Sequence, residues 1–334
     1  MIIALDALGG DRAPRESIAG AVQAAREFGV EIALVGPRAL IEDELARQAA
    51  STGGEPQPSG LHIVEASQAI GMDEAPAQAV RQKRDATINV AMRLVKDGGA
   101  SAVVSAGNTG AVVASALLNL GRLPGIERPA IGAIFPSTER GVLILDVGAN
   151  AVCKPSYMVQ FGYMGSAYME RIFGLERPRV GLLNIGEEEG KGNDLAQEVY
   201  EKLKKTSLNF VGNVEGKDIT SGGVDVVVTD GFTGNVLVKA SEALLEFAFA
   251  RVRRVVDSKL QYRLAGLVLR DALREMRRRL EYAEYGGVPL LGVNGVVIVA
   301  HGRADAVAFK NALRAAQDTA SSGLLAALTG VPKK

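Results

Sequence analysis

Short runs of branched apolar residues alternate along the chain with longer segments whose apolar positions return every three or four residues. The short runs are typical of strands buried on both faces, and the longer period is typical of amphipathic helices. The predicted strands cover residues 2–5, 32–35, 61–64, 102–104, 130–135, 142–145, 180–183, 209–211, 224–228 and 296–299. Helical segments at 13–28, 75–96, 110–120 and 194–205 follow four of them. Strand followed by helix, repeated along a chain, predicts an α/β fold with a mainly parallel sheet and helices on both faces.

The composition narrows the class of protein. The 334 residues are 47% hydrophobic, enough for one large α/β domain or two smaller ones. Basic and acidic residues balance at 38 each, so the overall charge gives no reason to expect a nucleic-acid partner. The first residues lead straight into a predicted strand and are not expected to be a leader peptide, and no apolar run approaches the ~20 residues of a membrane span. We therefore expect a soluble or at most surface-bound protein.

The chain has a single cysteine, Cys153, which excludes an intrachain disulfide and suits a reducing cytoplasm. Lys154 beside it could lower its pKa and make it a nucleophile. A small buried hydrophobe is the commoner role of a lone cysteine, and we favour that alternative.

One segment departs from the balanced charge. Residues 251–280 contain ten Arg or Lys and three acidic residues, a net charge of +7, so the rest of this neutral chain carries −7. The segment is helical in pattern, and the apolar stretch 264–269 holds Gly266, which could turn two helices into a hairpin. So much charge does not suit a purely buried element and predicts an exposed surface.

The predicted strands lead into loops of similar composition, rich in glycine and in small polar side chains. They read LDALGGD after the first strand, SAGNTG after 102–104, DVGAN after 142–145, NIGEEEGKGN after 180–183, TDGFTGN after 224–228 and HG after 296–299. In open parallel sheets, ligands bind outside the carboxyl ends of the strands. We therefore expect these loops to meet at one edge of the sheet and to form the site.

The chemistry of these loops suits an anion. Ser105, Asn108 and Thr109 lie at a predicted helix start, where free backbone amides and the helix dipole favour negative charge. Lys191 and Lys239 are candidate cations for the same ligand.

Other catalytic machinery is not evident in the sequence. The glycine loops lack the dinucleotide-binding spacing and the Ser or Thr of a P-loop, and two histidines cannot form a histidine metal cluster. Asp6, Asp146 and Asp230 could hold Mg²⁺, although strand-end aspartates also cap helices and brace glycine turns, which we favour. Asp11 is likewise expected to cap the first helix, with the proline at 14 in its first turn.

Taken in order, these residues closely resemble one bacterial family, the phosphate acyltransferases (PlsX). The match runs through the whole chain: ALDALGGDRAP, MDEAPAQAVRQKRD, SAGNTGA, ERPAIGA, LDVGAN, QFGYMG, RVGLLNIGEEEGKGN, FVGNVEGKDI, DVVVTDGFTGNV, YGGVPLLGV and the HG near the C-terminus. The family usually has methionine where this chain has Leu8, a swap of similar volume. The resemblance implies conversion of acyl-(acyl-carrier protein) and inorganic phosphate into acyl phosphate, an early step of phospholipid synthesis, with no cofactor and no metal.

The resemblance also implies a three-layer α/β/α, Rossmann-like fold, similar to phosphotransacetylases and isopropylmalate-type dehydrogenases, as a single domain over residues 1–334. A basic helical hairpin at 244–285 would protrude from it, with Leu264, Leu267, Val268 and Leu269 contacting an anionic membrane surface. A homodimer is implied, cytoplasmic and peripherally associated with the inner face of the plasma membrane. A dimer interface and docking of the acidic carrier protein are the other interpretations of the basic segment.

Under that hypothesis, the loop residues act on the reacting groups or bind them. Lys191, Asn193 and Asn235 would polarise phosphate or the thioester carbonyl. Asn108, also counted as catalytic, would hold the phosphate together with Ser105 and Thr109. The other candidates would line the phosphate and acyl-phosphate pocket: Asp6, Gly9, Gly10, Asp11, Ser105, Gly107, Thr109, Gly110, Asp146, Asn150, Asn184, Thr233, Lys239 and His301. Phosphate is already an anionic nucleophile and the leaving thiol has a pKa near ~8.5, so we expect direct transfer without an acyl-enzyme.

Other functions stay open on the sequence. An acyl-coenzyme A phosphotransacylase or an NAD-dependent β-decarboxylating dehydrogenase would share the architecture, although the dehydrogenase needs a metal site that the sequence does not suggest. A non-catalytic lipid-surface scaffold would use the basic segment but would leave the polar loops unexplained.

Overall fold

The computed structural model describes residues 1–51, 53, 56–138, 141–280 and 287–331, with the backbone alone at 277–280. Its strands are β1 (Ile2–Asp6), β2 (Glu31–Gly36), β3 (Leu61–Glu65), β4 (Ala102–Ser105), β5 (Ala130–Phe135), β6 (Val142–Leu145), β7 (Arg179–Leu183), β8 (Asn209–Val214), β9 (Val226–Val228), β10 (Val288–Leu291) and β11 (Val296–Val299). The ten predicted strands are confirmed, and β10 was missed. Its four-residue run contains Pro289, which cannot donate to a sheet and therefore argues against a strand.

The helices alternate with the strands for most of the chain. They are α1 (Arg15–Phe28), α2 (Arg38–Ser51), α3 (Pro76–Gln82), α4 (Thr87–Lys96), α5 (Thr109–Asn119), α6 (Pro155–Phe173), α7 (Asp194–Leu203), α8 (Gly216–Ser221), α9 (Gly231–Ser258), α10 (Leu260–Val268), α11 (Arg270–Leu280), α12 (Ala306–Ser321) and α13 (Leu324–Leu328). The predicted helix 75–96 is in fact two, because the backbone leaves the helical region at Lys83.

The strands form one sheet in the order β3-β2-β1-β4-β11-β10-β5-β6-β9-β7-β8. The first parallel group is β3, β2, β1, β4 and β11, and the second is β6, β9, β7 and β8. Between the groups, β11–β10, β10–β5 and β5–β6 pair antiparallel. These three reversals make the two groups run in opposite directions, so their carboxyl ends lie at opposite edges of the sheet. The prediction that all the strand-end loops meet at one edge is therefore wrong.

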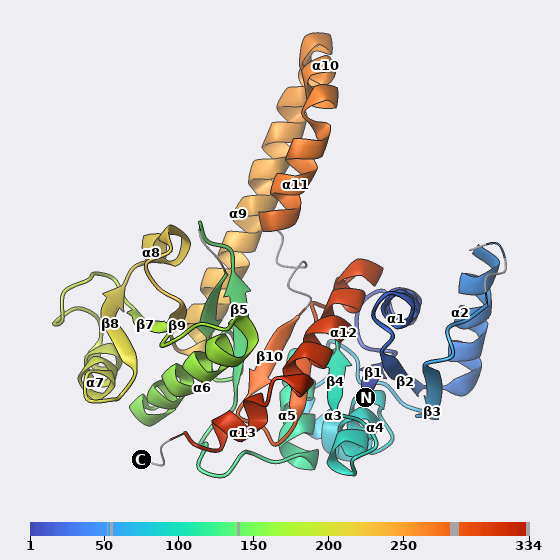
Figure 1. Ribbon diagram of the computed structural model, residues 1–334, viewed down its shortest axis with the longest axis horizontal. Coiled ribbons are helices and arrows are strands. Elements are labelled where there is room, and N and C mark those ends of the chain that lie inside the picture. The colour runs from blue at the N-terminus through green and yellow to red at the C-terminus, as the bar shows by residue number, and fades with distance from the viewer. Residues whose placement is uncertain (52, 54–55, 139–140, 281–286, 332–334) are drawn as a thin grey trace.

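Helices cover both faces of the sheet, which gives three layers (Figure 1). The buried clusters under α1 and α12 and under α6 and α13 share one partly buried neighbour, Leu325, so these helices form one layer. On the other face, the clusters under α4 and α5 and beside α8 share Val147 and Val238. Val238 belongs to α9, which therefore lies in the same layer as α5.

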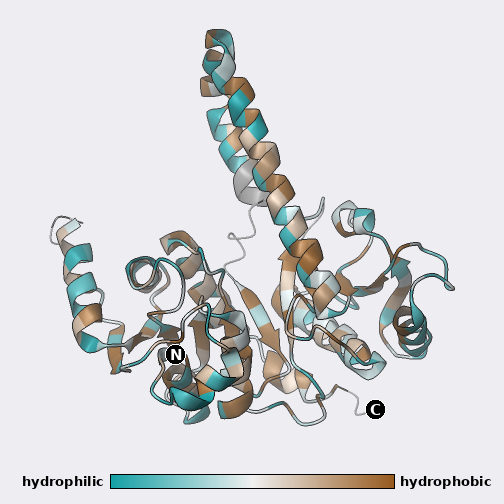
Figure 2. Cartoon of the chain, turned by 180° about the vertical axis from the view of Figure 1, so that it is seen from behind, coloured by the Kyte–Doolittle hydropathy of each residue, from teal (hydrophilic) through white to brown (hydrophobic). Residues whose placement is uncertain are grey.

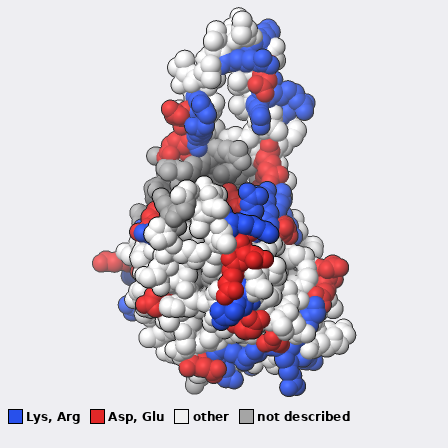
Figure 3. Space-filling view, turned by 90° about the vertical axis from the view of Figure 1, so that its right-hand side faces the viewer, with Lys and Arg blue, Asp and Glu red and all other residues white. Residues whose placement is uncertain are grey.

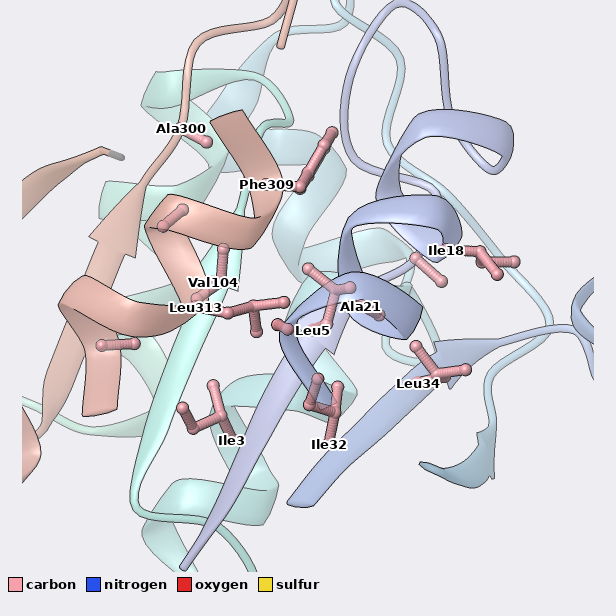
Figure 4. Close-up of a cluster of buried hydrophobic side chains, with 14 of the residues drawn as sticks. Ile3, Leu5, Ile18, Ala21, Ile32, Leu34, Val104, Ala300, Phe309 and Leu313 are labelled. Carbon is pink, nitrogen blue, oxygen red and sulfur yellow. The ribbon is translucent and has the colours of Figure 1, made fainter. Parts of the chain in front are cut away.

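The first half of the molecule shows how the layers fit (Figure 4). Ile3 and Leu5 of β1 point toward Ile18 and Ala21 of α1 and toward Phe309 of α12. A Cβ on Gly20 would collide with the side chain of Phe309, so glycine lets α1 and α12 pack in direct contact. The buried strand residues alternate between the two faces, as expected of a sheet with helices on both sides.

Helices α9, α10 and α11 project from the body (Figures 1 and 2). Lys and Arg side chains lie along them up to near the tip (Figure 3). The turn is not at Gly266, as predicted, but at Lys259, where the backbone is extended; Gly266 lies within α10, where a Cβ would be 2.6 Å from Val256 Cγ1. The limits 244–285 for the hairpin and the single domain stay predictions, and residues 281–285 lie outside the described residues. Across the described ranges, we find no helix with the length and apolar character needed to cross a membrane.

Candidate active site

A buried hydrogen bond joins the loops that follow β1 and β4. Ser105 Oγ donates to Asp6 Oδ2 over 2.7 Å and accepts the amide of Gly107 at 3.1 Å. Asp6 and Ser105 are both buried. A Cβ on Gly9 would lie 2.7 Å from Asp6 Oδ2 and 2.9 Å from the amide nitrogen of Gly107, so only glycine lets the loops pack this closely. We call these two loops, residues 6–11 and 105–110, the β1–β4 cluster.

Asp6 is the chemically unusual group of the β1–β4 cluster. Its Oδ1 has no hydrogen-bond partner in the described part of the chain. Burial raises the pKa of Asp6 above the ordinary value of 3.8, and the nearby hydroxyls of Thr87 and Ser105 oppose that shift in part. A protonated carboxyl in this position can donate a hydrogen bond as well as accept one.

The loop after β11 closes the β1–β4 cluster on a third side. The amide of Asp11 donates to the carbonyl of Gly302 over 2.7 Å. Gly10, at φ +113°, lies so close that a Cβ would be 3.2 Å from the same carbonyl. His301 is exposed beside this contact, and its Nδ1 accepts the amide of Arg303 at 3.1 Å. The loops after β1, β4 and β11 therefore do come together, as predicted for this half of the molecule.

Asp11 does not cap the first helix, contrary to the prediction. α1 begins at Arg15, and no side chain caps it. The hydroxyl of Ser17 instead donates to the carbonyls of Ala7 and Pro14, at 2.7 and 2.9 Å, and ties the first turn to the loop from within the helix. The carboxylate of Asp11 is left exposed at the rim.

Asn108 begins α5 and also holds a neighbouring loop. Its Oδ1 accepts the amide of Ala111 at 3.2 Å, and its Nδ2 donates to the carbonyl of Met72 at 3.0 Å. Both ends of the side chain therefore have partners. Thr109 and Gly110 are exposed at the helix N-terminus and are the part of this loop open to a ligand.

Asp146 organises a second cluster at the opposite edge of the sheet. Its Oδ1 accepts the amides of Ile131, Gly148 and Ala149 at 3.0, 3.2 and 3.1 Å. Its Oδ2 accepts the amide and the side-chain nitrogen of Asn150 at 2.7 and 3.0 Å. Burial raises the pKa of this carboxyl, and these hydrogen bonds to it oppose the shift. We call residues 146–150 and 229–235 the β6–β9 cluster.

The start of α9 packs directly on Asp146. A Cβ on Gly231 would lie 2.6 Å from Asp146 Oδ2, and one on Gly234 would collide with the carbonyl of Asp146. Asp230 caps the helix by accepting two amides of its first turn, at 3.0 and 2.9 Å, and the hydroxyl of Thr233 at 2.7 Å. The glycines of this loop therefore serve close helix packing, and the Thr233 hydroxyl is engaged within the helix.

Asn235 and Lys239 follow on α9. Asn235 is half-buried, with Cγ 3.7 Å from where a Cβ on Gly148 would be. Lys239 is exposed one turn later. Their predicted contacts with phosphate stay predictions.

Side-chain amides of two asparagines hold the loop after β7 in place. Asn184 Nδ2 donates to the carbonyl of Lys191 at 3.0 Å, and Asn193 caps α7 by accepting the amide of Ala196 at 2.9 Å. The side chain of Lys191 is exposed. Because β7 lies one strand beyond β9 in the sheet, this loop is further from the middle of the molecule than the β6–β9 cluster.

The two clusters share one hydrophobic support although they lie at opposite edges. Val112 of α5, Val147 and Ala149 beside Asp146, and Val238 of α9 all pack with the cluster that includes residues of β4, β11, β10 and β5. The N-termini of α5 and α9 therefore reach the same face of the sheet from its two edges. The candidate active site is the β1–β4 cluster with the start of α5, and the β6–β9 cluster lies at the opposite edge of the sheet.

Several residues at the candidate site were not singled out from the sequence. Thr87 lies beside Asp6, a Cβ on Gly302 would be 3.2 Å from Met72 Cε, and Arg12 and Arg303 flank His301 in one cavity. Met72 lies in the motif MDEAPAQAVRQKRD, which carried the family resemblance but follows no predicted strand closely. That motif was the signal from which Met72 could have been predicted as a site residue.

The strand-end aspartates Asp146 and Asp230 act as a brace and a cap, as favoured over metal binding. Their oxygens accept backbone amides of neighbouring turns. Among the residues that the structure describes, no group of three His, Cys, Asp or Glu side chains could hold a metal ion.

Solved structures with a similar fold are phosphotransacylases and a dehydrogenase. A phosphotransacetylase from Streptococcus pyogenes superimposes with a TM-score of 0.61 at 17% identity, over 96% of this chain and 94% of that chain. A branched-chain phosphotransacylase from Enterococcus faecalis V583 gives 0.58 at 14%, over 96% and 99%. The 4-hydroxythreonine-4-phosphate dehydrogenase from Klebsiella pneumoniae gives 0.56 at 12%, over 96% and 99%. At these identities the likeness shows the fold alone.

Sequence relatives are far closer. The model of the family described as "Fatty acid synthesis protein" matches residues 1–327. Two proteins named "Phosphate acyltransferase" are similar over almost their whole length. One, from Heliobacterium modesticaldum, is 51% identical over 328 residues, 98% of this chain and 96% of the relative. The other, from Desulforamulus reducens, is 48% identical over 326 residues, again 98% and 96%. The chain is therefore an enzyme and belongs to the phosphate acyltransferase family.

Proposed function

We propose that this enzyme transfers the acyl group of an acyl-(acyl-carrier protein) to inorganic phosphate, and that the acyl phosphate enters phospholipid synthesis. The observation that carries the proposal is the 51% identity, over 98% of the chain, to a protein named for phosphate acyl transfer. The phosphotransacylase fold is compatible with it. Acyl-coenzyme A is the alternative donor, and parallel assays with the two thioesters separate them.

Phosphate binding at the start of α5 is supported by the geometry of the β1–β4 cluster. A helix of eleven residues presents free amides at its N-terminus, and the helix dipole favours an anion there. Thr109 and Gly110 are exposed at that end. The buried Ser105–Asp6 hydrogen bond holds the preceding loop in place. Phosphate, already anionic, then needs orientation toward the thioester carbonyl more than it needs a base.

Direct attack by phosphate is supported by the state of Cys153, the candidate nucleophile of the sequence, and of the buried hydroxyl of Ser105. Ser105 is buried and its hydroxyl is engaged with Asp6. Cys153 is buried, and burial raises its pKa to about 11. Neither side chain is suited to forming an acyl-enzyme, which requires an accessible activated oxygen or sulfur.

Lys191 tests the assignment of the polarising groups. If it stabilises charge on phosphate or on the carbonyl, Lys191→Ala should lose about 10²–10³ in rate. Acyl phosphate is trapped with hydroxylamine and measured as the hydroxamate. The matched control is Lys202→Ala, an exposed lysine paired with Glu198 on α7. A Lys191→Ala variant with the control's rate would remove Lys191 from the mechanism, while a wild type that forms no hydroxamate would contradict the proposed function itself.

A homodimer is supported by an uncovered face of α9. Val236, Leu244, Phe247 and Val255 are exposed, and at 3.6 residues per turn they fall within an arc of about 100°, so they lie on one side of the helix. An exposed apolar stripe of this length is typical of a helix that packs on a partner, and a second copy offers the same stripe. Sedimentation at micromolar concentration tests this, and a monomer would contradict it.

Membrane association, with the protein on the cytoplasmic side of the plasma membrane, is supported by the tip of the projecting helices. Leu264, Leu267, Val268 and Leu269 are exposed there, within a segment of net charge +7. Apolar side chains flanked by basic ones suit an anionic lipid surface. Leu267→Glu should reduce flotation with anionic vesicles, whereas Val307→Glu, a comparably exposed position on α12, should not. Unchanged flotation of Leu267→Glu, together with a raised KM for the carrier thioester, would favour carrier docking instead.

A further inference from the structure

A cavity of about 870 Å³ lies between the projecting helices and the body of the enzyme. It is lined by α9 and α11 on one side and by the end of β5 and the start of α12 on the other. Its volume is within the range of small-molecule sites, which is roughly 300–1,000 Å³. None of the steps described above uses it.

The interior of the cavity is mainly apolar. Leu245, Phe249, Val252 and Val256 of α9 line it together with Leu273 of α11. The four α9 positions are spaced by four, three and four residues, so they form one continuous face of that helix. From 245 to 256 this face extends about 16 Å, at ~1.5 Å per residue. The apolar face is therefore long enough to lie along an extended aliphatic chain.

The base of the cavity is lined by polar side chains and lies near the candidate active site. At the base it is lined by Arg12, His301 and Arg303, and Arg303 also pairs with Glu246 at 3.7 Å. Arg12 directly follows Asp11, which is bonded to Gly302 in the rim of the β1–β4 cluster. At the far end, Val256 meets Gly266 of α10. Arg253 of α9 and Arg270 and Arg274 of α11 also line the cavity, so its arginines are not confined to the base. The base lies next to the loop that carries Asp11, and the apolar face of α9 leads from there toward the tip of the helices.

We propose that this cavity holds the acyl chain of the thioester substrate and of the acyl phosphate product. The carbonyl end lies at Arg12 and His301, and the methyl end lies toward Val256 and Gly266. Guanidinium and imidazole groups suit the phosphate that the product carries at its polar end. This inference rests on the proposed function and adds to it the position of the acyl chain and the residues that limit its length.

The test compares thioester donors with long and short acyl chains in variants whose larger side chains fill the cavity at two depths. Val256→Trp, at the far end, should lower kcat/KM for a hexadecanoyl carrier thioester at least tenfold and leave the octanoyl thioester within twofold. Leu245→Trp, near the base, should lower both by a similar factor. Leu40→Trp makes the same chemical change as Leu245→Trp at an exposed α2 position outside the cavity lining, and it should change neither rate.

The outcomes are decided by the hydroxamate assay together with sedimentation. Equal losses for the two donors in Val256→Trp, or no loss, would overturn the inference while leaving the transfer reaction intact. A variant that changes the oligomeric state and not the length preference would also overturn it, because the cavity would then be filled by a second copy. Val252→Phe is a milder change at a partly exposed position and gives the same length test if Val256→Trp does not fold. Failure of the wild type to form hydroxamate from either donor would contradict the proposed function instead.

Discussion

Two buried aspartates, Asp6 and Asp146, end strands in the two halves of the molecule and differ in their hydrogen bonding. Both are followed by glycine-containing loops, and each of those loops packs against the start of another loop or helix. Asp146 accepts five N–H groups and uses both of its oxygens. Asp6 accepts the hydroxyl of Ser105 through Oδ2, with the Thr87 hydroxyl and the amides of Leu8 and Gly9 nearby, and its Oδ1 is without a partner in the described chain.

The difference separates a carboxylate with a structural role from one that has an oxygen free to accept a further hydrogen bond. A carboxylate that satisfies five buried amides cannot leave them without a large cost, so Asp146 fixes the β6–β9 cluster. A buried carboxyl with a free oxygen and a raised pKa is typical of a site that performs chemistry or positions a group that does. Burial raises the pKa of both carboxyls, and the free Oδ1 distinguishes Asp6. We therefore predict that the β1–β4 cluster is the more reactive of the two clusters.

The largest expected effect is on stability, in Asp146→Ala. Removing the carboxylate leaves four backbone amides without their acceptor, while the side-chain nitrogen of Asn150 keeps the carbonyl of Pro129. At about 1–3 kcal/mol for each buried unsatisfied group, partly relieved by water, we expect a loss of more than about 4 kcal/mol in the free energy of unfolding. Urea unfolding measures this loss. The control is Asp43→Ala, on the exposed side of α2, whose free energy of unfolding should stay within about 0.5 kcal/mol of the wild type. A loss as small as the control's would mean that Asp146 is not the brace of its cluster.

The sequence was sufficient to predict ten of the strands, but the prediction that the strands run in a single direction was wrong. Ten strands could be predicted because each is a short Val/Ile/Leu-rich run, and burial on both faces leaves that mark locally. The antiparallel pairs β5–β6 and β10–β11 are joined by the short connections 136–141 and 292–295, which leave no room for a parallel crossover. The prediction did not use that signal for 130–135 and 142–145. The pairing of β10 with β5 joins distant segments and leaves no local mark. The expectation of one rim followed from assuming a single direction.

The candidate site shows the same division between local and distant information. The caps by Asn108, Asn193 and Asp230 lie within four residues of the amides they bind, and the predicted polar helix starts correctly located them. The contact of Asp6 with Ser105 joins residues 99 apart and could only be guessed from the shared edge of the sheet. The difference between Asp6 and Asp146 is invisible in their sequences, because it depends on which amides the folded loops turn toward them.

A smaller effect, with a definite pH dependence, is expected in Asp6→Asn. Because burial raises the pKa of Asp6, folding takes up a proton between the ordinary value of 3.8 and the raised one. The unfolding free energy of the wild type therefore falls as the pH rises through that window, and the contribution is fully present only below 3.8. The amide variant has no proton to lose and keeps an acceptor for Ser105. Its stability relative to the wild type should therefore rise with pH in urea unfolding between pH 4 and 8, whereas a pH-independent difference would show that Asp6 ionises normally.

The smallest effect is expected at Cys153, which lies beside the β6–β9 cluster, with Sγ 3.6 Å from the carbonyl of Asn150. Burial raises its pKa to about 11, and the charges of Asp146 and Asp230 add to that shift. With that pKa, roughly one thiol in a thousand is ionised at pH 8, and the thiolate is the reactive form. Cys153→Ala should keep the wild-type rate of hydroxamate formation, and the wild-type thiol should react with iodoacetamide far more slowly than free cysteine. Rapid alkylation with loss of turnover would move catalysis into the β6–β9 cluster, and the assignment of chemistry to the Asp6 half would then be wrong.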